Sequence, residues 1–250
     1  MGFAMSQRAE ILSTGRYRVR FGEGQTDLAA AQTLRSLCFG TIHKDLDRFD
    51  VLCSHILVED VGSGELVCSF RILELGDGRE ISQSYSGQFY ELSRLAEYPC
   101  PMIEVGRFCS HPNWTDPDIL RLAWAALTRI VDERGVQMLF GCSSFAGIEV
   151  ESHLDAFAIL QQRYLAPERW RPQAKAPNLI RFDLLKRSEM VGSQAVLAVP
   201  PLLRSYLMMG GWVSDHAVVD RDMNTLHVFT GLEIGAIPEA RQRLLRGLAD

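Results

Sequence analysis

One stretch of the chain constrains the fold more than any other, because a strand, a long helix and a second strand follow one another in it. Residues 118–134 place apolar side chains along one helical face, and Gly135 ends the helix. Residues 102–109 have the pattern of a strand, and residues 136–143 are an apolar run of the kind found deep in a sheet. This order predicts a helix that packs against a β-sheet.

The remaining segments predict further strands and helices around that stretch. Residues 55–59 and 66–73 have the pattern of a hairpin, and Asp27 is expected to cap a helix that Gly40 ends. Residues 89–95 are expected to form a short helix. The whole order predicts the α/β (α+β) class, with one mixed sheet flanked by helices.

The organisation of the chain is simple, since it contains no internal repeat and no linker long enough to separate domains. We expect a flexible leader over residues 1–16 and a single domain over residues 17–250.

Composition and charge exclude several classes of function. The 250 residues carry a net charge of -5, whereas proteins dedicated to nucleic acids are usually basic. No run approaches the roughly 18 apolar residues of a membrane span, and the N-terminus lacks the apolar core of a signal peptide. We therefore expect a cytoplasmic protein that does not bind nucleic acid.

Metal sites and several named catalytic motifs are not expected either. The six cysteines contain no CxxC pair, and the six histidines lack i,i+4 spacing. The patterns GxSxG, HExxH and GxGxxG are absent.

Charged residues inside apolar strands are the strongest chemical signal in the sequence. Glu104 and Arg107 share one predicted strand, Arg71 lies in another, and Asp50 and His55 stand at the start of the hairpin. Charges rarely occupy such positions unless they are paired or functional. Two interpretations stay open: an ion-pair network that fixes the fold, or a catalytic site.

A set of short strings is distinctive in combination: Phe49-Asp50, Cys53 to Val58, Glu91 to Leu95, Glu104 to Arg107 with His111-Pro112, Phe140 to Phe145, Leu197 to Tyr206 with Gly211, and Asp220, Asp222 and Asn224. Together they resemble the hemolysin-like acyltransferases that make lyso-ornithine lipid. That group is related to the acyl-homoserine-lactone synthases, and both share the fold of the GCN5-related N-acetyltransferases (GNAT). The similarity runs from about residue 17 to about residue 230.

The resemblance implies a GNAT-like acyl-CoA N-acyltransferase fold and a specific reaction. A 3-hydroxyacyl chain would pass from acyl carrier protein to the α-amine of ornithine, giving lyso-ornithine lipid. No bound cofactor is then expected, because the donor is carried on the 4'-phosphopantetheine of the carrier protein. Three alternatives stay open: glutamine as the substrate, an acyl-homoserine-lactone synthase, and an inactive module that binds carrier protein or membrane.

This reaction needs a base, because the α-amine of an amino acid is mostly protonated at neutral pH. Glu104 on its apolar strand is expected to have a raised pKa and to accept that proton. His55 is the second candidate, since the ordinary pKa of histidine is about 6.5. Arg107 or Arg71 would orient Glu104 or bind the substrate carboxylate.

Other residues are expected to bind the amino acid substrate. Asp50 or Asp220 would pair with the cationic side chain of ornithine, whereas Asn224 would suit an amide. The matched strings add three consecutive residues and one arginine on a predicted helix as candidates: Ser143, Ser144, Phe145 and Arg204. Cys142 would allow a covalent acyl intermediate, but direct transfer is favoured because a neutral amine is already a good nucleophile.

Two features favour a donor on a carrier protein. The loop at residues 111–118 has no glycine and contains two aspartates, so it is unsuited to the pyrophosphate of coenzyme A. A loop without any ligand is the alternative there. The segment 163–187 has seven basic and two acidic residues, so it could attract the acidic carrier protein. The docking candidates are Arg163, Arg169, Arg171 and Lys175, with Trp170 as an anchor. Two alternatives stay open for this segment: a solvated loop, and a peripheral contact with anionic lipid at the inner face of the cytoplasmic membrane.

Overall fold

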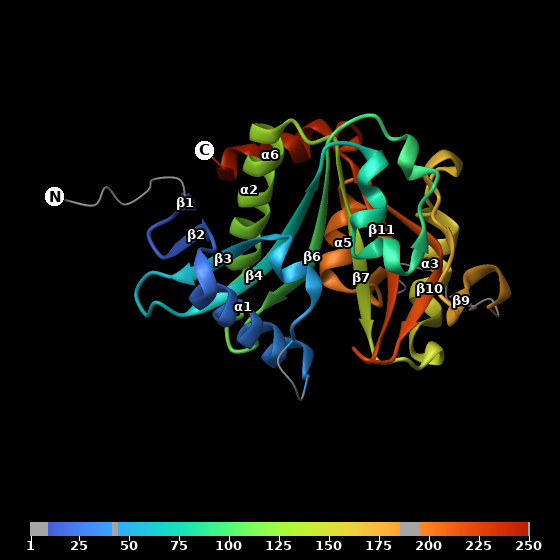
Figure 1. The fold of residues 1–250 in the computed structure, drawn as a ribbon, viewed down its shortest axis with the longest axis horizontal. Coiled ribbons are helices and arrows are strands. Elements are labelled where there is room, and N and C mark those ends of the chain that lie inside the picture. The colour runs from blue at the N-terminus through green and yellow to red at the C-terminus, as the bar shows by residue number, and fades with distance from the viewer. Residues whose placement is uncertain (1–9, 42–44, 186–195, 250) are drawn as a thin grey trace. The chain divides into compact units, whose positions relative to one another are not determined.

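The computed structural model describes residues 10–41, 45–185 and 196–249 of the chain (Figure 1). It contains two compact units. The first unit comprises residues 1–73, 105–135 and 239–250, and the second comprises residues 74–104 and 136–238. The expectation of a single domain over residues 17–250 stays a prediction.

The first unit is built on an antiparallel meander that continues into a further strand. In sheet order its strands are β1 (Glu10–Ser13), β2 (Tyr17–Phe21), β3 (Ser54–Asp60), β4 (Leu66–Leu75) and β6 (Met102–Ser110). The last two residues of β4 and the first three of β6 belong to the second unit. Strand β1 pairs with β2, and β2 with β3. The expectation of a flexible leader is therefore wrong for residues 10–13, because their two buried apolar side chains, Ile11 and Leu12, join the core.

The helices of the first unit begin and end at recognisable local signals. They are α1 (Gly24–Phe39), the 3-10 helix η1 (Arg48–Val51), α2 (Pro117–Arg134) and α6 (Glu239–Ala249). Helix α2 is capped by the side chain of Asp116, and Gly135 ends it in the left-handed conformation, close to the prediction. Asp27 does not cap α1. It lies in the first turn, where it pairs with Arg20 and accepts a hydrogen bond from the Glu23 N–H.

The second unit contains a mixed sheet. Residues 102–104 of β6 pair in parallel with β7 (Met138–Ala146), and the remaining strands are antiparallel: β11 (Thr225–Glu233), β10 (Trp212–Asp220) and β9 (Leu179–Arg181). Among the described residues of this unit, the sheet is accompanied by two helices and three 3-10 turns, namely α3 (Leu154–Arg163), α5 (Pro201–Met208), η5 (Val150–His153), η7 (Phe182–Leu184) and η8 (Ile234–Ala236). The predicted class, a mixed sheet flanked by helices, is confirmed.

One layer of the second unit consists of short pieces rather than long elements. It contains η2 (Gly78–Gln83), η3 (Ser86–Gln88), β5 (Tyr90–Glu91), η4 (Leu95–Glu97), η6 (Glu168–Trp170) and β8 (Gln173–Ala174). Strands β5 and β8 pair as a separate two-stranded sheet. The short helix predicted over residues 89–95 is therefore wrong, because Tyr90 and Glu91 form backbone pairs with a distant segment instead.

The apolar core of the second unit gathers side chains from α3, α5 and the sheet. Phe145 of β7 packs edge to face on Phe157 of α3, and Phe157 stacks on Phe182 with ring centroids 4.9 Å apart. All three rings are about 1% exposed or less. This packing holds helix α3 and the segment around Phe182 against strand β7.

Candidate functional site

Three arginines and three aspartates of the first unit form one buried ion-pair network. Arg71 lies 2.7 Å from Asp47 and 2.8 Å from Asp50. Arg35 pairs with Asp45 at 2.8 Å and with Asp50 at 2.6 Å. Arg107 pairs with Asp45 at 2.9 Å and with Asp47 at 3.2 Å. Each carboxylate therefore contacts two guanidiniums, which is the arrangement that makes buried charges tolerable.

The centre of this network is Asp50, whose side chain is 0% exposed. Burial alone would raise its pKa, but hydrogen bonds from Arg35 and Gln32 and the charge of Arg71 hold that pKa well below its ordinary value. With both carboxylate oxygens engaged by these groups, the structure argues against Asp50 as the partner of a cationic ornithine side chain. Its role here is to hold the network together.

The network also occupies the two arginines that were expected to act on substrate. The Arg71 side chain is 3% exposed and binds Asp47 and Asp50, and Arg107 is 12% exposed and binds Asp45 and Asp47. Arg107 has a φ of 52°, in the left-handed region that L-residues rarely adopt. The first unit thus matches the ion-pair interpretation for Asp50, Arg71 and Arg107.

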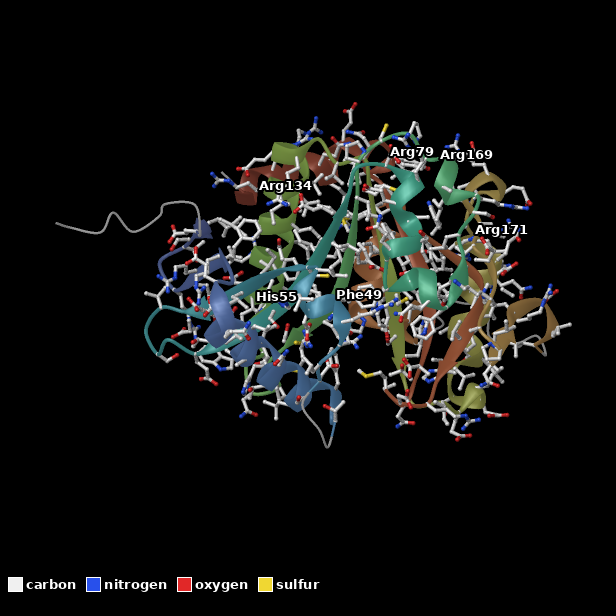
Figure 2. The ribbon with its side chains drawn as sticks, in the orientation of Figure 1. Phe49, His55, Arg79, Arg134, Arg169 and Arg171 are labelled. Carbon is white, nitrogen blue, oxygen red and sulfur yellow. The ribbon has the colours of Figure 1, made fainter. Side chains whose placement is uncertain are left out.

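His55 of β3 belongs to the same cluster and is labelled with Phe49 in Figure 2. Its Nε2 lies 3.0 Å from the backbone carbonyl of Asp50, so that nitrogen carries a proton and donates it. Burial lowers the pKa of His55, against a smaller opposing effect of the Asp50 carbonyl. The lowered pKa favours the neutral ring, which holds the Asp50 carbonyl through its hydrogen bond. The role of His55 as a base stays a prediction.

Glu104 lies in the second unit, and its carboxylate is held by a tight turn. The side chain is buried, and the residue is 4% exposed. Its Oε2 accepts a hydrogen bond from the Tyr85 N–H at 2.7 Å, and its Oε1 accepts from the Ser86 N–H at 2.7 Å and the Ser86 hydroxyl at 2.6 Å. Three donors to one carboxylate stabilise its negative charge and fix its orientation.

The Ser86 hydroxyl also contacts the thiol of Cys142 on β7, with Oγ and Sγ 3.4 Å apart. A hydroxyl has one proton, and here the carboxylate takes it, so the thiol is the donor to Ser86. The hydrogen bonds therefore run from Cys142 through Ser86 to Glu104. This geometry favours a neutral thiol at Cys142 rather than a nucleophilic thiolate.

The turn that holds Glu104 is itself held by hydrogen bonds from two further side chains, Ser84 and Lys175. Ser84 is 0% exposed, and its hydroxyl donates to the Ile81 carbonyl and accepts from the Gly87 N–H. The ammonium of Lys175 donates to the Gly87 carbonyl. Lys175, one of the expected docking residues, is therefore engaged in supporting this turn.

The other expected docking residues lie on α3 and η6. Arg163 is exposed in the last turn of α3. Arg169 is 67% exposed and lies 3.3 Å from Glu233, which also accepts from the indole N–H of Trp170 at 3.2 Å. Figure 2 labels Arg169 and Arg171 in this region of the second unit. Since several of these charges are already paired, the segment is less positive than its composition suggests.

The remaining expected substrate residues have ordinary structural surroundings. Ser143 accepts a hydrogen bond from the Thr230 hydroxyl, and Phe145 belongs to the apolar core. Asp220 accepts from the Met223 N–H in the turn before β11, where Asn224 has a φ of 50°. Aspartate and asparagine are common in such turns. Ser144 is exposed on β7, and Arg204 is half-buried on α5.

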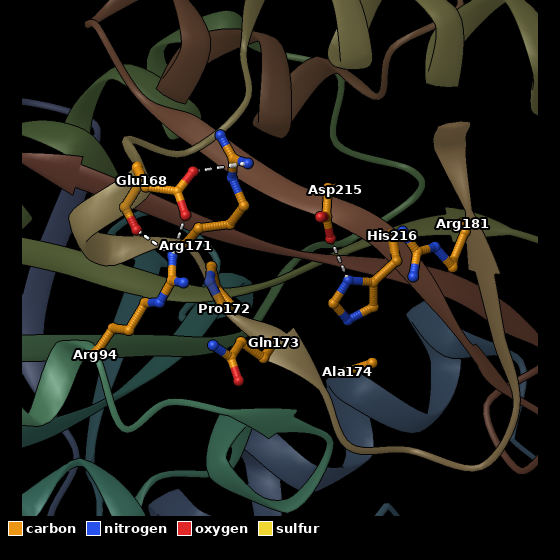
Figure 3. Close-up of a pocket in the computed structure, with 9 residues that line it drawn as sticks. All are labelled: Arg94, Glu168, Arg171, Pro172, Gln173, Ala174, Arg181, Asp215 and His216. Carbon is orange, nitrogen blue, oxygen red and sulfur yellow. Dashed lines mark hydrogen bonds and ion pairs between the residues drawn. The ribbon is translucent and has the colours of Figure 1, made fainter. Parts of the chain in front are cut away.

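A pocket of about 250 Å³ opens in the second unit beside η6, β8 and β10 (Figure 3). Seven polar side chains line it: Arg94, Glu168, Arg171, Gln173, Arg181, Asp215 and His216. The Nδ1 of His216 lies 2.7 Å from the carboxylate of Asp215, and burial leaves its Nε2 without a hydrogen-bond partner. Nothing in the sequence marked this pocket, because its residues come from four separate segments.

Metal ligands and membrane spans were sought among the described residues. Residues 10–41, 45–185 and 196–249 contain no group of three or more His, Cys, Asp or Glu side chains placed to hold a metal ion. Within the same ranges, no helix is long and apolar enough to cross a membrane.

Comparison with known proteins gives the class first. The model of the acetyltransferase (GNAT) domain matches residues 16–125. The fold is similar to that of an N-acyl amino acid synthase from uncultured soil microbes, with a TM-score of 0.50, 10% identity, and coverage of 89% of this chain and 94% of that one. The chain therefore has the GNAT fold.

Two curated relatives then give the family. The L-ornithine N(alpha)-acyltransferase of Rhodobacter capsulatus is 30% identical over 240 residues, which cover 89% of this chain and 92% of the relative. That of Brucella abortus is 27% identical over 255 residues, which cover 94% of this chain and 91% of the relative. The chain belongs to the L-ornithine N(alpha)-acyltransferase family.

The candidate residues taken from the sequence did not include Ser86, nor Arg35 and Gln32, which are two of the partners of Asp50. Ser86 stands in a polar stretch, Ser82 to Ser86, that looks like a linker, and only the fold shows that it meets Glu104. A signal was present for Asp47, because Asp47 and Asp50 form a capping box around η1 at the spacing expected for one.

Proposed function

We propose that this protein transfers a 3-hydroxyacyl chain from acyl carrier protein to the α-amine of ornithine, giving lyso-ornithine lipid. The observation that carries the proposal is the likeness to relatives named L-ornithine N(alpha)-acyltransferase along nearly their whole length. The amino acid is inferred from those names, and the carrier protein from the loop at residues 111–118, whose aspartates disfavour a coenzyme A pyrophosphate.

Glu104 is the base in this proposal. An ammonium group must lose a proton before its nitrogen can attack the thioester carbonyl. The carboxylate of Glu104, oriented by Tyr85 and Ser86, can take that proton before the attack and release it to solvent. After the carbon–nitrogen bond forms, the nitrogen loses a second proton and the carbon–sulfur bond breaks. The sulfur of the phosphopantetheine leaves as a thiol with that second proton, and the amide remains.

Direct transfer is preferred to an acyl-enzyme because of the orientation of the Cys142 thiol. Its proton is directed to Ser86, whose own proton goes to Glu104. Replacement of Cys142 by alanine is therefore expected to leave turnover within about threefold of the original rate. Detection of an acyl group on Cys142 by mass spectrometry of the quenched reaction would establish the covalent route instead.

A peripheral membrane contact is part of the proposal, since the product is an amphiphile. It is supported by three exposed apolar side chains around η1: Leu46, Val51 and Leu52, at 67%, 80% and 58% exposure. Sedimentation with vesicles of anionic phospholipid, with and without a Leu46→Ser, Val51→Ser, Leu52→Ser triple variant, tests this contact. Equal sedimentation of the two proteins would remove it from the proposal.

The function itself is tested by mass spectrometry of one competition reaction. Purified protein is incubated with 3-hydroxyacyl carrier protein and equimolar ornithine, glutamine and homoserine derivatives. N-acyl-ornithine is the expected product, and the Glu104→Gln variant, checked for its melting temperature, serves as the blank. Formation of N-acyl-glutamine would show that glutamine is the substrate, and release of a homoserine lactone would show that the protein is an acyl-homoserine-lactone synthase. Binding of the carrier protein without any product would show a carrier-binding module that has no activity.

A further inference from the structure

Two arginines beside the pocket of Figure 3 hold a carboxylate between them. The Oε1 of Glu168 lies 2.8 Å from the guanidinium of Arg94, and its Oε2 lies 3.3 Å from that of Arg171. Each oxygen thus meets a different arginine. Arg94 and Arg171 thus form a binding site for one carboxylate, called the seat below, and in this structure Glu168 of the same chain occupies it.

Both arginines are held in place by contacts that do not depend on the Glu168 carboxylate. Arg94 also donates to the backbone carbonyl of Glu168. Arg171 donates through Nε and Nη2 to the carbonyl of Ala166, at 3.3 and 3.1 Å. The guanidiniums therefore stay in position when the carboxylate leaves, so the seat is preorganised.

The carboxylate that occupies the seat is easily displaced. The Glu168 side chain is 74% exposed, whereas Arg94 and Arg171 are 36% and 30% exposed. Ion pairs between exposed side chains contribute little to stability, since solvent and salt screen them. Exchange of Glu168 for a carboxylate from another molecule costs little, because one carboxylate replaces another of the same geometry.

We propose that Arg94 and Arg171 receive a carboxylate of the acidic acyl carrier protein, which takes the place of the Glu168 side chain. This inference rests on the proposed function, since it assumes a donor on a carrier protein. Glu168 then acts as an internal competitor that weakens docking. Arg94, which the sequence did not mark, joins Arg171 as a docking residue.

The charges around the seat favour a partner with separate carboxylates, such as an acidic protein, over a membrane surface of anionic lipid. Arg181 beside the pocket is paired with Asp183 at 2.9 Å, and Asp215, 41% exposed, lines the pocket itself. Acidic and basic groups therefore alternate around it. A protein helix with spaced carboxylates fits such a pattern, whereas the aspartates would repel a uniform layer of anionic lipid headgroups.

The test compares two acyl donors in steady-state kinetics. One is the 3-hydroxyacyl carrier protein, and the other is the same acyl chain on N-acetylcysteamine, a small thioester without any protein. The Arg94→Gln, Arg171→Gln double variant is expected to raise the KM for the carrier protein about tenfold and to leave its kcat unchanged. The Glu168→Gln variant is expected to lower that KM about threefold. Neither variant should change kinetics with the small thioester.

The matched control is an Arg121→Gln, Arg129→Gln double variant. These arginines are 57% and 46% exposed on α2 and pair with carboxylates of their own helix, so the control removes the same charge and the same kind of contact. A KM for the carrier protein within twofold of this control overturns the proposal, as does an equal rise with the small thioester. If only sedimentation with phosphatidylglycerol vesicles is lost, the seat binds lipid and the proposal is also wrong.

Failure of the proposed function gives a different result. In that case the unmodified protein transfers no acyl group from the carrier protein, whatever stands at positions 94, 168 and 171. An unmodified protein that uses the carrier protein, together with unresponsive variants, overturns only the seat.

Discussion

At the scale of single residues, the two groups of buried charges have different surroundings and different uses. Asp50 pairs with two guanidiniums, those of Arg35 and Arg71, so that its negative charge is compensated by positive charge. Glu104 accepts three hydrogen bonds from one turn, from the Tyr85 N–H and from the N–H and hydroxyl of Ser86. These donors fix the orientation of the carboxylate, which a group that accepts a proton from substrate needs.

Ser86 is expected to matter through Glu104. Replacement of Ser86 by alanine removes the 2.6 Å hydrogen bond to Oε1 and keeps both backbone donors. A charge-assisted hydrogen bond is worth about 1.5–3 kcal/mol, so we expect kcat to fall about ten- to hundredfold with little change in KM. The acid limb of the kcat–pH profile should move to higher pH, because the carboxylate loses a donor to its charged form.

The control for that variant is Ser82→Ala, at an exposed serine of the same layer. It should leave both the rate and the pH profile unchanged. A purely structural role for Ser86 would lower the melting temperature and leave the acid limb in place, and that result would contradict the positioning role.

Asp50 is expected to act on stability. The Asp50→Asn variant removes a charge that faces two guanidiniums in a site without solvent. Loss of one partner in a buried ion pair costs about 3–5 kcal/mol, which for a chain of this size lowers the melting temperature by roughly 6–20 °C. Calorimetry measures the shift against Asp183→Asn, a change at a carboxylate that is 53% exposed in its pair with Arg181. Equal melting temperatures of the two variants would show that the network is dispensable.

At the scale of elements, the layer of short turns in the second unit depends on close backbone contact. A Cβ on Gly78 would lie 2.0 Å from the Leu95 carbonyl oxygen and 2.9 Å from the Tyr98 nitrogen. The Gly78 N–H also donates to the Tyr98 carbonyl at 2.8 Å. Helix η2 can therefore pack on η4 only where position 78 lacks a side chain.

Gly78→Ala is expected to force η2 and η4 apart. Strain from an added methyl group in a packed site costs about 1–3 kcal/mol, and the turn that holds Glu104 follows directly after η2. We expect a lower melting temperature together with lower activity. Gly76→Ala is the matched control, since its Cβ would meet only the flexible Glu80 side chain, at 3.6 Å. Indistinguishable behaviour of the two alanine variants would contradict this view of the layer.

The elements also show what the sequence could and could not predict. Helix α2 was predictable because Pro117 and Gly135 mark its ends locally. Strand β5 was not, because Tyr90 and Glu91 become a strand only by pairing with Gln173 and Ala174, far along the chain. The same reason hid Ser86. Glu104 was noticed as a charge on an apolar strand, whereas its partner lies on another element and has an unremarkable sequence around it.

At the scale of the whole molecule, the two units differ in how many charged pairs they bury. The first unit contains the network of Arg35, Arg71 and Arg107 with its three aspartates. The second unit contains the aromatic core around Phe145, Phe157 and Phe182, without charges among its buried members. Apolar packing does not respond to protonation, whereas paired carboxylates do.

Acid is therefore expected to loosen the first unit before the second. Burial would raise the pKa of Asp47, but the guanidiniums of Arg71 and Arg107 hold it below its ordinary value. Burial and Arg35 act on the pKa of Asp50 in the same two directions, and the result is again a lowered pKa. A carboxylate whose pKa is depressed by folding adds stability above its unfolded pKa of about 3.9, and this stability is lost as the pH falls through the folded value. Hydrogen exchange at pH 7 and near pH 3, expressed as protection factors, should show β3 and β4 losing protection while β7 and β11 retain theirs. Simultaneous loss in all four strands would mean that the two units unfold together, and that the network does not set the acid limit of the fold.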